Sequence, residues 1–129
     1  MFLALLDDDE KRAFTLLAEK MIVKDGIAVT SETRALANLR HEMGLDEDAF
    51  WEDKGLDELA AAFGSRRSKV AALLELVGLG YSDRTYSAAE SGFTMDIARA
   101  MGMATELDRI EAWVQQHVRH VEAALEMMQ

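Results

Sequence analysis

The sequence predicts an all-α protein, a compact bundle of about six or seven helices built from two pseudo-repeated helical hairpins. Apolar residues recur at the three- and four-residue spacing of a helix face, and no stretch alternates with the period of two that marks a strand. The 129 residues include no proline, the commonest helix breaker. Half of the residues are apolar, so we expect one domain with its own core over residues 1–129.

The first half of the chain contains four expected helices, whose boundaries rest on capping residues. Asp7, Asp8 and Asp9 supply N-cap candidates and first-turn acids for the first helix, and Gly26 can take the positive φ that ends it. Thr30 or Ser31 is the expected N-cap of the second helix, which stops at Gly44. The expected helices cover residues 10–24, 31–43, 46–53 and 56–63.

The second half contains three expected helices, and the first of them is the most apolar. Leu73, Leu74 and Val77 belong to its broad apolar stripe, so we expect this helix to be central and buried on more than one side. The three helices cover residues 66–82, 88–101 and about 105–127. The last one carries a continuous stripe of Leu107, Ile110, Trp113, Val114, Val118, Val121 and Leu125.

Acidic residues recur at a fixed offset along the chain. Asp25 and Asp83 lie 58 residues apart (83 − 25), and Glu32 and Glu90 keep the same offset. Each half contains an apolar helix, Asp, six residues, Glu, an amphipathic helix and Met-Gly. We therefore expect two similar hairpins related by an approximate twofold axis, with the Asp and Glu at equivalent corners. The predicted pseudo-repeats cover about residues 14–45 and 72–103.

The residues around these corners follow one pattern in both copies. The first copy consists of Leu16-Leu17-Ala18, Val23-Lys24-Asp25-Gly26, Glu32, Leu36, Leu39 and Met43-Gly44-Leu45, and the second of Leu73-Leu74, Tyr81-Ser82-Asp83, Glu90 and the segment from Ala98 to Met101-Gly102-Met103. Over roughly residues 9–113 the pattern resembles the TerB-like family of tellurite-resistance and stress-response domains. Arg84 stands where the family pattern has Gly.

The resemblance implies a compact all-α domain whose acidic residues hold a divalent metal ion. It also implies a cytoplasmic role near membrane-associated stress-response complexes, and hence a protein partner. Hard cations such as Ca²⁺ and Mg²⁺ take several carboxylate and carbonyl oxygens. The candidate ligands are Asp25, Glu32, Asp83 and Glu90. The competing interpretation is that each Asp caps or turns the chain and each Glu complements a helix N-terminus.

Composition argues against several other functions. The chain has no cysteine, which excludes disulfides, thiolate metal sites and cysteine nucleophiles. A net charge of −10 and a pI near 4.7 argue against nucleic acid, because binding phosphates needs a basic face. The longest apolar stretch, residues 70–81, is shorter than the roughly 20 residues of a membrane span. We expect no enzymatic activity, because no nucleophile and base can be paired.

Two smaller features leave alternatives open. Arg66, Arg67 and Lys69 form a basic cluster that suits an acidic partner or an intramolecular carboxylate. His117 and His120, three residues apart, are a second and weaker metal candidate. The main alternative to a metal-binding domain is a metal-free helical module for protein–protein interaction.

Overall fold

The computed structural model describes residues 2–22, 30–44, 54–81 and 86–129, and for residues 30–33 it describes the backbone only. Six α-helices and two short 3₁₀ turns make up these ranges, which contain no strand, so the all-α prediction is confirmed. The expected helix over 46–53 lies outside the described residues. The elements are η1 (Leu3–Leu5), α1 (Asp8–Ile22), α2 (Thr30–Glu42), α3 (Leu56–Ala61), α4 (Arg66–Gly80), α5 (Ala88–Ala100), η2 (Ala104–Glu106) and α6 (Leu107–Met127).

Three helices begin at reciprocal hydrogen bonds between a side chain and the backbone. At α1 the Glu10 N–H donates to Asp7 Oδ1 at 2.8 Å, and the Asp7 N–H donates to Glu10 Oε1 at 2.9 Å. Similar capping boxes link Ser65 with Ser68 at α4 and Ser87 with Glu90 at α5. These bonds satisfy N–H groups that the first helical turn leaves without a partner.

The helix boundaries repeat with the offset seen in the sequence. The helices α1 and α4 both have 15 residues and begin 58 residues apart (66 − 8), while α2 and α5 both have 13 residues and also begin 58 apart (88 − 30). Gly44 and Gly102, at the same offset, follow α2 and α5 with φ of +71° and +72°. This left-handed backbone favours glycine and ends a helix.

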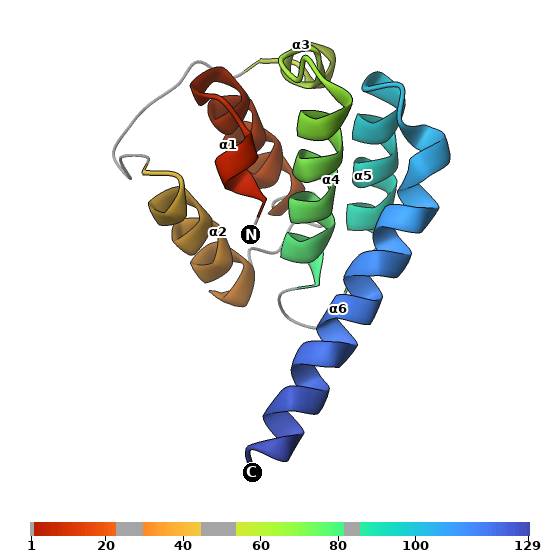
Figure 1. The fold of residues 1–129 in the computed structure, drawn as a ribbon. Helices are drawn as coiled ribbons and strands as arrows, with labels where there is room; N and C mark the ends of the chain where they lie inside the picture. Colours follow the sequence, from red (N-terminus) through yellow and green to blue (C-terminus); the bar gives the residue numbers. More distant parts are fainter. Residues whose placement is uncertain (1, 23–29, 45–53, 82–85) are drawn as a thin grey trace.

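The pair α1–α2 packs against the pair α4–α5, with contacts both within and between the two pairs. Both α1 and α4 contact α2 and α5, and they also contact each other, so they form the centre of the bundle (Figure 1). The short α3 contacts α1 and α5, and α6 lies along α4. In Figure 1 the C-terminal half of α6 runs past the other described helices, none of which lies beside it. Within the described ranges, each helix is too short or too polar to cross a bilayer.

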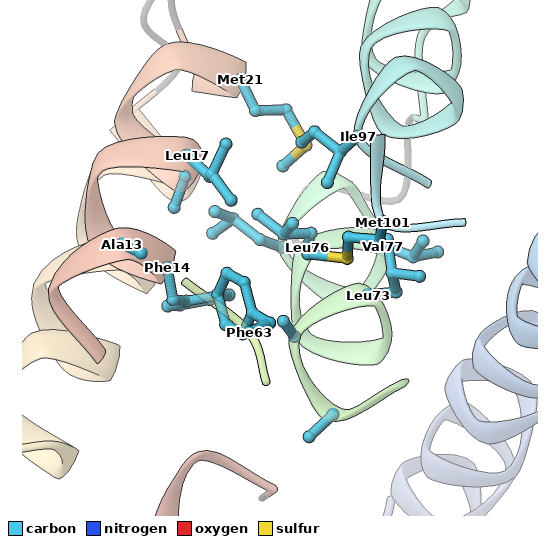
Figure 2. Packing of buried hydrophobic residues seen from close by; sticks show 14 of the residues in the cluster. Ala13, Phe14, Leu17, Met21, Phe63, Leu73, Leu76, Val77, Ile97 and Met101 are labelled. Atoms are coloured by element: carbon cyan, nitrogen blue, oxygen red, sulfur yellow. The ribbon is translucent and has the colours of Figure 1, made fainter. Parts of the chain in front are cut away.

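One cluster of buried side chains draws on all six α-helices. Figure 2 shows its centre, where side chains of α1, α4 and α5 meet. The labelled residues include Phe14, Leu17 and Met21 of α1, Leu73, Leu76 and Val77 of α4, and Ile97 of α5. Buried residues lie on several sides of α4, as the sequence predicted for its most apolar helix.

Two details of the predicted apolar stripes differ from the structure. On α4, Leu73 and Val77 are fully buried, whereas Leu74 is only partly buried and Leu76 fills the core instead. On α6, the stripe residues Leu107, Ile110 and Val114 are buried, whereas Trp113, Val121 and Leu125 are 43%, 46% and 50% exposed. The spacing of apolar residues shows which side of a helix is apolar, but it does not show how much of that side the neighbouring helices cover.

Leu17→Ala should destabilise the protein much more than Leu16→Ala, its neighbour on α1. The Leu17 side chain is fully buried, so its truncation leaves a cavity and should lower the free energy of unfolding by about 2–5 kcal/mol. Leu16 is only partly buried against the core, so its truncation should cost clearly less. Urea denaturation of both variants measures the difference, and equal losses of stability would contradict the described difference in burial between Leu17 and Leu16.

Candidate functional site

The structure describes only one of the four predicted metal ligands in full. Asp25 and Asp83 lie outside the described residues, and Glu32 lies in α2 with its side chain outside the description. Glu90 is described, in the first turn of α5. No group of three or more His, Asp or Glu side chains that could hold a metal ion occurs within the described part of the chain. The convergence of the four carboxylates therefore stays a prediction.

Glu90 is a buried carboxylate that serves first as a capping residue. Its side chain is 2% exposed. The Ser87 N–H donates to Glu90 Oε1 at 3.1 Å, and the Glu90 N–H donates to Ser87 Oγ at 3.1 Å. The competing interpretation of this Glu, as a residue that complements a helix N-terminus, therefore holds for one of its two oxygens.

The second oxygen of Glu90 has a different environment. Glu90 Oε2 is buried and has no hydrogen-bond partner among the described residues, and the same is true of the Tyr86 hydroxyl. Burial of an oxygen without a partner costs free energy, and the cost is larger for a charged group. Such an atom suggests that a ligand or a further residue completes its surroundings.

Glu10 is the other buried carboxylate at the start of a described helix, and both of its oxygens have hydrogen-bond partners. Glu10, 6% exposed, accepts the Asp7 N–H on Oε1 and the Gly64 N–H on Oε2, the latter at 3.4 Å. Both oxygens of Glu10 thus have backbone partners, whereas Glu90 has one such oxygen and one orphan. The two side chains are matched in burial and differ in this respect.

Tyr86 and Gly80 pack closely together beside Glu90 Oε2, and we call these two residues the wall beside Glu90. A Cβ atom on Gly80 would lie 2.6 Å from Tyr86 Cδ1 and 3.3 Å from Glu90 Oε2, so glycine permits this close approach. The Tyr86 ring stacks on Tyr81, with 4.8 Å between ring centroids. Burial raises the pKa of the Tyr86 phenol to about 12, so the hydroxyl is neutral at pH 7.

A second surface, which the sequence analysis did not identify, lies on the face formed by η1, α4 and α6. Phe2, Val70, Leu74 and Trp113 line a hollow of about 570 Å³, which we call the apolar groove. The Phe2 N–H donates to Glu75 Oε1 at 2.7 Å, which fixes the start of the described chain on α4. The signal in the sequence was the short apolar segment at the N-terminus, whose role depends on contacts with residues about seventy positions away.

Arginines surround this groove. Arg66, Arg67 and Arg109 lie among the residues that line it or the adjoining hollow of about 540 Å³. Arg66 pairs with Glu106 at 3.3 Å, which is the intramolecular carboxylate that the sequence left open as one option. Arg67 and Arg109 are exposed and form no ion pair with another described residue.

The two histidines of α6 have different environments in the structure. His117 stacks on Trp113 with parallel rings, 5.2 Å apart and 5° from coplanar, at the edge of a pocket next to the groove. His120 is exposed. The expectation that His117 and His120 bind a metal together gains no support, because the described residues offer no group of three ligands.

Comparison of the chain with protein-family models, with curated proteins and with solved structures gave no match.

The pair Gly78→Ala and Gly80→Ala tests the close packing beside Glu90. Gly78 has no described atom within 4 Å of an added Cβ, so alanine should stabilise α4 by up to about 1 kcal/mol through its higher helix propensity. At Gly80 the added Cβ meets the Tyr86 ring, so we expect a loss of about 1–3 kcal/mol. Thermal denaturation gives both signs, and a stabilising Gly80→Ala would contradict the described wall.

Proposed function

We propose that this chain is a non-enzymatic, TerB-like stress-response domain of the tellurite-resistance type that binds a divalent cation of the Ca²⁺ or Mg²⁺ kind. The ligands would be Asp25, Glu32, Asp83 and Glu90. The observation that carries the proposal is the buried Glu90 Oε2, which lacks a hydrogen-bond partner among the described residues.

The energetics of that oxygen favour a cation. A buried carboxylate is stable when hydrogen bonds or an opposite charge replace the water that it has lost. The capping box supplies this for Oε1 only. A divalent cation beside Oε2 would supply the rest, and hard cations prefer such oxygen ligands.

The arrangement of helices supports a shared site. Glu90 and Glu32 occupy equivalent positions, because each is the third residue of its helix in two helices of equal length. Asp25 and Asp83 fall in the sequence between the two helices of each pair, α1 and α2 in one and α4 and α5 in the other. Since α1 contacts α5 and α4 contacts α2, a cation held by both copies would tie the two pairs together.

The remaining parts of the proposal follow from the resemblance and from the composition. We place the domain in the cytoplasm, with a protein partner and near membrane-associated complexes. The proposal includes no reaction, because no nucleophile and base have been identified.

A metal-free helical module for protein–protein interaction is the second candidate. The apolar groove lined by Phe2, Val70, Leu74 and Trp113 favours it, because apolar surface next to arginines that form no ion pair with another described residue is typical of a binding surface. The two candidates use different parts of the molecule and can be tested separately.

Millimolar Ca²⁺, Mg²⁺ or Mn²⁺ should raise the melting temperature of the wild-type protein. A ligand that binds only the native state at about 100 times its Kd adds roughly 2.7 kcal/mol, which is several degrees for a domain of this size. Glu90→Gln should abolish the shift, because it removes the charge but keeps an oxygen for the Ser87 N–H. Asp25→Asn combined with Asp83→Asn should do the same.

Glu10→Gln is the matched control, because Glu10 is a buried capping carboxylate whose two oxygens already have backbone partners. It should lower the stability slightly and leave the metal-induced shift intact. If Ca²⁺, Mg²⁺, Mn²⁺ and Zn²⁺ all leave the melting temperature of the wild type unchanged, the acidic residues are helix caps and turn residues, and the interaction module takes the place of the metal-binding domain.

A further inference from the structure

We draw no further inference here: the strongest candidate, the apolar groove of η1, α4 and α6 together with the exposed apolar side chains that follow it along α6, is an apolar surface, and nothing in the described part of the chain shows what covers it.

Discussion

Burial of α4 on several sides is the constraint on which the rest of the structure depends. This helix contacts α1, α2, α5, α6 and η1, more elements than a helix with one apolar stripe can satisfy. Small residues make this possible, because Ala71, Ala72 and Gly80 are buried and let neighbouring elements come close. The crosswise packing of the two hairpins, the wall beside Glu90 and the floor of the groove all rely on this one helix.

The starts of α1 and α5 show how the fold places carboxylates in its interior. In both helices a Glu in the first turn completes a capping box, so backbone N–H groups draw the side chain inward. A helix N-terminus also favours negative charge. The difference arises from the surroundings: the Gly64 N–H reaches the second oxygen of Glu10, while the second oxygen of Glu90 faces Gly80 and Tyr86, neither of which donates to it. Capping explains why Glu10 and Glu90 are buried, and it leaves Glu90 Oε2 without a hydrogen-bond partner among the described residues.

Much of the fold could be predicted from the sequence because its signals are local. Asp7, one of three acidic N-cap candidates, caps α1, and Gly44 follows α2 with a positive φ, so both mark helix ends as the sequence predicted. The partial exposure of Leu74 and the apolar groove could not be predicted, because both depend on which elements pack beside α4 and α6. The predicted metal site depends on residues 25 and 83, outside the described ranges, so only its Glu90 can be placed. That this carboxylate is buried with one oxygen unpaired follows from packing, which a first-turn Glu in a sequence does not reveal.

The extension of α6 has a consequence for local stability. The first turns of this helix are fixed by Leu107, Ile110 and Val114 in the core, whereas the turns beyond Val118 are held by their own backbone hydrogen bonds and little tertiary packing. Isolated helical turns are marginal in water, so amide hydrogen exchange should quicken along a single continuous helix, from rates set by global unfolding to rates set by fraying. A contact made with the end of α6 can therefore order these turns without disturbing the packing of the core.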